Sequence, residues 1–63
     1  MAREVIFEFV VVGNSMKVTA FDPETLIEVS LVGSPTAPES HLRAVARRKL
    51  EYVLQRRAAG QDP

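Results

Sequence analysis

The sequence predicts one α+β domain: a three-stranded antiparallel meander, strand order 1-2-3, followed by one long C-terminal helix packed on one sheet face. Two turn signals, at residues 13–14 and 22–25, divide the first half of the chain into three segments with the residue content of strands. The second half has apolar residues at helical spacing. With 63 residues, 46% of them hydrophobic, the chain has the composition of a single small globular domain.

The first two strands are expected at about residues 3–12 and 15–22, which are rich in β-branched and aromatic side chains. Gly13 and Asn14 between them both tolerate positive φ, as a two-residue hairpin turn requires. Such a turn fixes the register, and with it the face on which each side chain lies. The predicted pairs are Val12 with Ser15, Val11 with Met16, Phe9 with Val18, and Phe7 with Ala20.

The third strand is expected at about residues 26–32, after the turn "DPET". Asp at the first position and Pro at the second suit a type I turn. If Leu26 takes a bulge position after the turn, Ala20 lies opposite Val29, and the apolar residues of the third strand join the face predicted for the first two. A bulge there usually has Gly, so Leu26 is expected to adopt an unfavourable positive φ.

The helix is expected from about residue 37 to residue 58. Thr36 and Glu39 have the spacing of a capping box, and Gly60 is a natural stop before a tail, 60–63, that should fray. On a helical wheel the main apolar stripe consists of Leu42, Ala46, Leu50, Val53 and Leu54. This stripe should cover the apolar sheet face, with Phe9 beneath Leu50 or Val53.

The segments "KVTAFDPETLIEVSLVG" and "RRKLEYVL" resemble those of a family of small uncharacterised bacterial proteins. The resemblance extends over about residues 4–57 and implies a domain of unknown function with a three-stranded meander and a C-terminal helix. Leu26 departs from the Gly expected after the Asp-Pro turn. The resemblance implies no reaction and no site residues.

The basic residues of the helix raise the question of anion binding. Residues 1–33 have a net charge of minus three and residues 34–63 of plus three. Phosphate binding needs cations that converge on one surface, whereas these residues are spread around the helix, so a solvated rim is favoured. Lys49 is expected to extend its amine to water, or alternatively to pair with a sheet Glu across a subunit interface. The alternative hypothesis is a nucleic-acid-associated protein, in which the residues that contact the nucleic acid are Arg43, Arg47, Arg48, Arg56 and Arg57.

We expect no catalytic, cofactor-binding or metal-binding residues, and hence no enzyme. His41 is the only histidine, and the chain has no cysteine. His41 has no second ligand at metal-site spacing, and Ser40, although adjacent in sequence, does not face it as a nucleophile would. The glycines do not form a phosphate-binding loop, because "VVVGNSMK" lacks the second Gly and the Gly-Lys-Ser/Thr ending.

The apolar stretches are shorter than the roughly 20 residues that span a bilayer, and the start of the chain is a poor match to a signal peptide. Together with the missing cysteine, these features predict a cytoplasmic protein without a membrane partner.

One helix covers one sheet face, so the other face is expected to bind a partner. A small domain with an unused apolar face and an open edge strand favours a homodimer, through either the edge of strand 1 or the outer face. A different, unknown protein partner is the other possibility. The candidate contact residues are Ile6, Val10, Val12 and Phe21, with Val45 and Tyr52 from the helix. The sequence therefore predicts a non-catalytic interaction or structural module.

Overall fold

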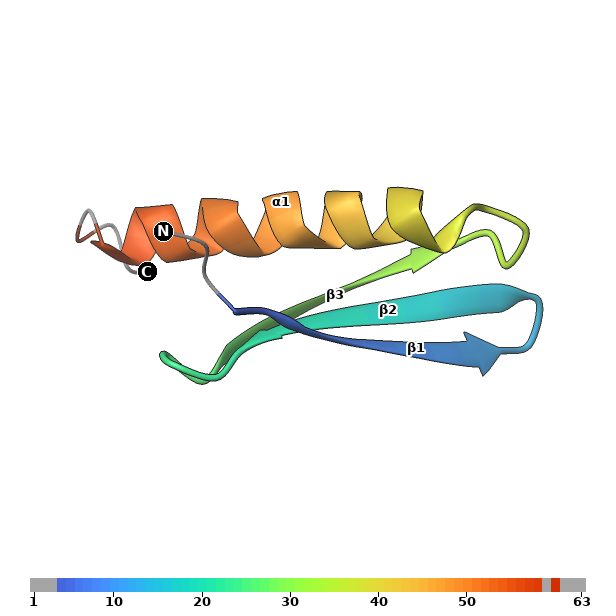
Figure 1. The fold of residues 1–63 in the computed structure, drawn as a ribbon, viewed down its shortest axis with the longest axis horizontal. Coiled ribbons are helices and arrows are strands. Elements are labelled where there is room, and N and C mark those ends of the chain that lie inside the picture. Colours follow the sequence, from blue (N-terminus) through green and yellow to red (C-terminus); the bar gives the residue numbers. More distant parts are fainter. Residues whose placement is uncertain (1–3, 59, 61–63) are drawn as a thin grey trace.

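The structure, a computed structural model, describes residues 4–58 and 60. It confirms the predicted α+β architecture, with an antiparallel sheet of order β1-β2-β3 and one helix along one side of it (Figure 1). The elements are β1 (Ile6–Val12), β2 (Ser15–Asp22), β3 (Ile27–Gly33) and α1 (Glu39–Ala58). The predicted start of the first strand at residue 3 lies outside the described residues, as does the predicted fraying tail apart from Gly60.

The β1–β2 hairpin has the register that its turn predicts. Val12 lies opposite Ser15 and Phe9 opposite Val18. Gly13 has a φ of 60°, a conformation that a residue without a Cβ adopts at little steric cost. The turn chemistry therefore determines which β1 side chains face α1.

The β2–β3 turn is organised by Asp22, which is fully buried. Its backbone carbonyl accepts a hydrogen bond from the Leu26 amide at 2.8 Å. Its carboxylate accepts one from the Glu24 amide at 3.1 Å and one from the Thr25 hydroxyl at 2.9 Å. Leu26 follows with a φ of 64°, as predicted, and Asp22 lies opposite Ile27 across the ladder. The side chain of Asp22 thus holds the loop that sets the second register.

The start of α1 differs from the capping box predicted by the sequence. The Thr36 hydroxyl is 2.8 Å from that of Ser34, and the Ser34 hydroxyl also accepts from the Thr36 amide. The Pro38 carbonyl accepts the first helical bonds, from the amides of residues 41 and 42 at 3.0 and 3.1 Å. The helix begins at Glu39, and the Thr36 hydroxyl bonds within the preceding Ser34–Thr36 turn instead of capping the first turn of α1.

The core lies between α1 and the strands β2 and β3, against which the helix packs. Its buried members, each no more than 5% exposed, are Val18, Ala20, Leu42, Ala46 and Leu50. Gly33 allows close approach at one end of the core, because a Cβ there would lie 2.7 Å from Leu42 Cδ2. The helix is therefore held over the β2–β3 half of the sheet, and this position leaves β1 at the margin of the core.

Candidate interaction surface

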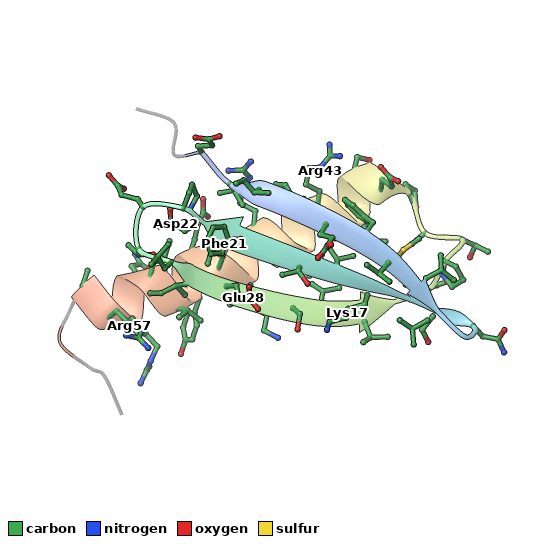
Figure 2. All side chains as sticks on the ribbon, turned by 90° about the horizontal axis from the view of Figure 1, so that it is seen from below. Lys17, Phe21, Asp22, Glu28, Arg43 and Arg57 are labelled. Carbon is green, nitrogen blue, oxygen red and sulfur yellow. The ribbon has the colours of Figure 1, made fainter. Side chains whose placement is uncertain are left out.

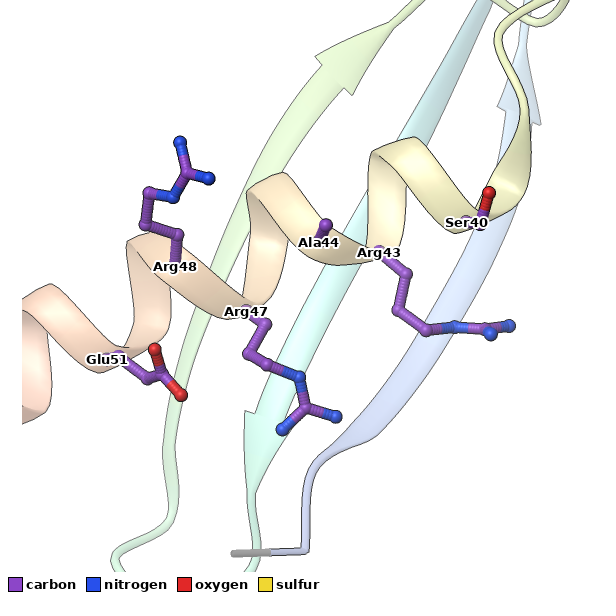
Figure 3. Close-up of a pocket in the computed structure, with 6 residues that line it drawn as sticks. All are labelled: Ser40, Arg43, Ala44, Arg47, Arg48 and Glu51. Carbon is purple, nitrogen blue, oxygen red and sulfur yellow. The ribbon is translucent and has the colours of Figure 1, made fainter. Parts of the chain in front are cut away.

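The α1-facing side of β1 is covered by arginine side chains. Phe7 and Phe9 are half-buried and pack beside the core. The Arg43 Cζ atom lies 5.6 Å from the ring centroid of Phe7 and 5.8 Å from that of Phe9, and the Arg47 Cζ atom lies 5.5 Å from the Phe7 centroid. Figure 3 shows both arginines extending from α1 toward the β1 side. Each contact at such a partly exposed site is worth about 0.5–1 kcal/mol.

Phe9 packs against the core, and the Arg43 guanidinium also lies over its ring, a contact that the expected covering by Leu50 or Val53 did not include. Arg43 also lies 3.8 Å from the Glu39 carboxylate, one helical turn earlier. The two arginines therefore do more than line a solvated rim, because their guanidinium groups lie over half-buried aromatic rings. A sequence signal was available: Arg43 and Arg47 directly follow the buried Leu42 and Ala46, and so flank the buried stripe.

Val11 is more exposed than the two phenylalanines that share its side of β1. The register places it on the α1-facing side, opposite Met16, yet its side chain is 64% exposed. Val18, which has the same orientation on β2, is fully buried. The helix offset that buries the middle strand thus leaves apolar surface open at the end of β1.

Apolar exposure is concentrated on β1. Four of its seven residues are large hydrophobic side chains with at least 43% of their surface exposed. These residues are Ile6 (49%), Val10 (43%), Val11 (64%) and Val12 (57%). Within β3, Val32 is the only large hydrophobic residue that is exposed to this extent, at 68%. Such a concentration on one edge strand is typical of a surface that a partner covers.

The two edge strands differ in how their outer backbone groups are occupied. The Lys49 ammonium donates a hydrogen bond of 2.7 Å to the Ser30 carbonyl on β3. The lysine was expected either to extend into water or to form an ion pair, and its bond to a strand carbonyl is a contact the sequence did not suggest. Among the described residues, no backbone hydrogen bond from outside the sheet reaches β1. A lysine at a sheet edge is a recognised block to pairing, and β1 lacks one.

The candidate contact residues from the sequence fall into separate groups. Ile6 lies opposite Phe21, which is half-buried, while Val10 lies opposite Lys17. A polar row, formed by Glu8, Thr19 and Ser30, lies between these two apolar groups of the outer face. Figure 2 shows this face, with Lys17, Phe21 and Glu28 labelled on it.

The helix candidates lie in the other layer of the domain. Val45 is 37% exposed and Tyr52 is 57% exposed. Both share a helical side with Lys49, which reaches the β3 edge, and they lie far from β1. The structure therefore does not join the helix candidates to the β1 candidates in one surface.

The basic side chains do not converge. A surface depression on α1 is lined by Ser40, Arg43, Ala44, Arg47, Arg48 and Glu51. Within it, Arg48 points away from the other two arginines (Figure 3). Arg56 lies 5.5 Å from the Tyr52 ring centroid and donates a 3.1 Å hydrogen bond to its hydroxyl. Figure 2 places Arg57 on the β3 side of the sheet, opposite Arg43 on the β1 side.

The described residues contain no group of three or more His, Cys, Asp or Glu side chains that could hold a metal ion. His41 is exposed on the first turn of α1. None of the helices in the described part of the chain is long and apolar enough to cross a membrane.

Comparison with known proteins gives a family and nothing beyond it. A search of curated proteins found no match, and a search of solved structures found none either. A family model described as a domain of unknown function, DUF6898, matches residues 2–57, a span that includes all three strands and nearly the whole of α1. The chain belongs to the DUF6898 family.

Proposed function

We propose that this domain is a non-catalytic interaction module of the bacterial cytoplasm that works as a homodimer, with β1 as its contact strand. The observation that carries the proposal is the concentration of exposed large hydrophobic side chains on an edge strand that the helix does not cover. The absence of cysteine from the sequence fits a reducing compartment.

The size of the domain supports self-association. A chain of about 60 residues buries only about 60% of its unfolded surface, and its stability alone is small. Here the fully covered core has five hydrophobic residues. A second copy on β1 would remove further apolar surface from water at about 25 cal/mol per Å2, and so would stabilise both chains.

Sedimentation analysis at micromolar concentration tests the proposal. We expect a species of twice the 7.0 kDa chain mass that dissociates on dilution. A folded 7.0 kDa monomer at all concentrations up to about 100 µM would rule the homodimer out. The dissociation constant would then be weaker than the micromolar values of specific association.

A matched pair of variants locates the contact. Val11 on β1 and Val32 on β3 are 64% and 68% exposed, so Asp at either position should perturb the isolated chain equally little. Val11→Asp should weaken the dimer at least about tenfold, since the contact would desolvate an unpaired charge. Val32→Asp should leave the dimer intact. If Val32→Asp dissociates the dimer and Val11→Asp does not, the contact strand is β3 or the face that carries Val32.

Nucleic-acid association is the second candidate, and the observation in its favour is that Arg43, Arg47 and Arg48 line one depression. Two of these guanidinium groups already lie over aromatic rings, which makes this candidate the weaker one. Fluorescence anisotropy with a labelled duplex at about 50 and 200 mM salt tests it, because binding through phosphates weakens steeply with salt. No binding at micromolar protein would eliminate it. Salt-sensitive binding should be lost when Arg43, Arg47, Arg48, Arg56 and Arg57 are replaced by Gln.

A further inference from the structure

The hydrogen-bonding pattern of the sheet indicates which backbone groups of β1 face outward. The Ser30 carbonyl points to the free edge of β3, where it accepts the Lys49 ammonium, so Ser30 and its partner Thr19 are a non-hydrogen-bonded pair. Hydrogen-bonded and non-hydrogen-bonded pairs alternate, and each residue directs both backbone groups to the same side. Thr19 therefore bonds to Glu8 on β1. The residues of β1 that direct their amides and carbonyls to the open edge are Phe7, Phe9 and Val11.

A twofold antiparallel pairing of β1 with its own copy has few possible registers. The outward-facing residues of the two copies must lie opposite one another for hydrogen bonds to form. A register centred on Phe9 pairs all seven residues of β1, because Ile6 and Val12 then lie opposite each other. A register centred on Glu8 pairs only residues 6–10. It also places Glu8 opposite the partner's Glu8, and the repulsion between the two carboxylates disfavours it. A register centred on Val10 pairs only residues 8–12.

We infer that β1 pairs with β1 of a second copy in the register centred on Phe9, which gives a continuous six-stranded sheet. This inference deepens the proposed homodimer and rests on it. A twofold axis through an antiparallel pair is perpendicular to the sheet, so the helices of both copies lie on the same face. The association is β-strand addition with a second copy of this chain as the added strand.

The register places apolar side chains opposite apolar side chains on the α1-facing side. Phe9 lies opposite the partner's Phe9, and Val11 lies opposite the partner's Phe7. The 64% exposure of Val11 in the single chain is thereby covered by an aromatic ring. Arg43, whose guanidinium group contacts both rings of its own β1, is then next to the twofold axis.

The outer face and the far edge agree with this register. Ile6 lies opposite the partner's Val12, which covers side chains that are 49% and 57% exposed in the single chain. Glu8 lies opposite the partner's Val10, away from its own symmetry copy. The β3 edge is not expected to pair with a further chain in this way, because Lys49 already bonds to the Ser30 carbonyl on that edge. The assembly therefore stops at two chains.

Engineered cysteines test the register cleanly, because the natural sequence has none. Ile6 and Val12 would form a non-hydrogen-bonded pair with Cα atoms about 4.5 Å apart, a separation within the range that disulfides tolerate. Within one chain the same residues are about 20 Å apart along the strand, so they cannot bond to each other. Ile6→Cys and Val12→Cys are prepared as separate proteins, mixed, and oxidised mildly; non-reducing electrophoresis then shows which samples contain covalent dimers.

The expected result is a covalent dimer in the mixture and little in either variant alone. The Val10→Cys and Glu8→Cys variants are controls, because each should cross-link with itself only if it lies on the twofold axis. A self-linked Val10→Cys or Glu8→Cys, with no product in the mixture, would overturn the Phe9 register. If the wild-type protein sediments as a dimer and none of these samples cross-links, β1 pairing is wrong while the homodimer stands. A monomeric wild-type protein overturns both.

Discussion

Leu26 provides a direct test of how the β2–β3 turn is built. It is a non-glycine residue with a φ of 64°, and its side chain is 74% exposed. The informative comparison is between Leu26→Gly and Leu26→Ala. Both variants remove the same side-chain contacts, but Ala keeps the Cβ that makes a left-handed backbone unfavourable. The difference between them therefore isolates the backbone conformation.

The expected magnitude follows from three contributions. A left-handed conformation costs a residue with a Cβ about 1–2 kcal/mol, and Gly loses about 0.5–1 kcal/mol of this advantage through its greater freedom in the unfolded chain. Leu26→Gly should therefore be more stable than Leu26→Ala by about 0.5–1 kcal/mol. The covered quarter of the leucine side chain is worth about 0.5 kcal/mol, so the gain over wild type is at most about 0.5 kcal/mol.

Thermal unfolding followed by circular dichroism, at one fixed protein concentration, measures both differences. For a domain of this size 1 kcal/mol corresponds to about 4–8 °C, so the Gly variant should melt about 2–8 °C above the Ala variant. Equal melting temperatures, or a more stable Ala variant, would show that the positive φ of Leu26 does not determine the stability of this turn.

Four further predictions concern other parts of the fold. Phe9→Ala should lower the free energy of unfolding, measured in urea, by about 2 kcal/mol, roughly half the loss for a fully buried ring. Val10→Ala, on the exposed face, should lower it by less than about 1 kcal/mol. The reverse order would contradict the register. Gly33→Ala should destabilise by about 1–3 kcal/mol through overpacking, measured in the same way, and an unchanged midpoint would mean that the helix shifts freely. Asp22→Ala should cost about 1–3 kcal/mol and Asp22→Asn less, since Asn can still accept from the turn amide. Lys49→Ala should produce larger assemblies than the wild-type protein in light scattering, through pairing at the β3 edge, and unchanged assembly would show that the lysine does not protect that edge.

Much of the fold could be predicted from the sequence, because both turns are determined by short-range chemistry. Gly13 with Asn14 fixes one register and the Asp-Pro turn fixes the other, and the structure has both. The positive φ of Leu26 was predictable for the same reason. The capping box at Thr36 was wrong: the Thr36 hydroxyl bonds to Ser34 in the preceding turn, and sequence spacing does not rank two such local hydrogen-bond partners.

The position of the helix across the sheet could not be predicted. A helical wheel identifies which side of α1 is apolar, but the stripe can lie over any pair of strands. The close packing of Leu42 on Gly33 is a contact between α1 and β3 that helps to set this position. The exposure of Val11 and the covering of Phe7 by Arg47 both follow from it, so the candidate surface could be seen only in the structure.

The offset of α1 also has a consequence for local stability. The buried side of the helix packs mainly on β2 and β3, so β1 is held by its ladder to β2, by the half-buried Phe7 and Phe9, and by two arginine side chains. In the isolated chain the least costly opening is therefore the detachment of β1, with the β2–β3–α1 unit still folded. Amide hydrogens of Glu8 and Val10 would exchange with solvent sooner than those of β3 residues bonded to β2. Because a detached β1 exposes its whole backbone, the same motion would offer the proposed dimer a route to form.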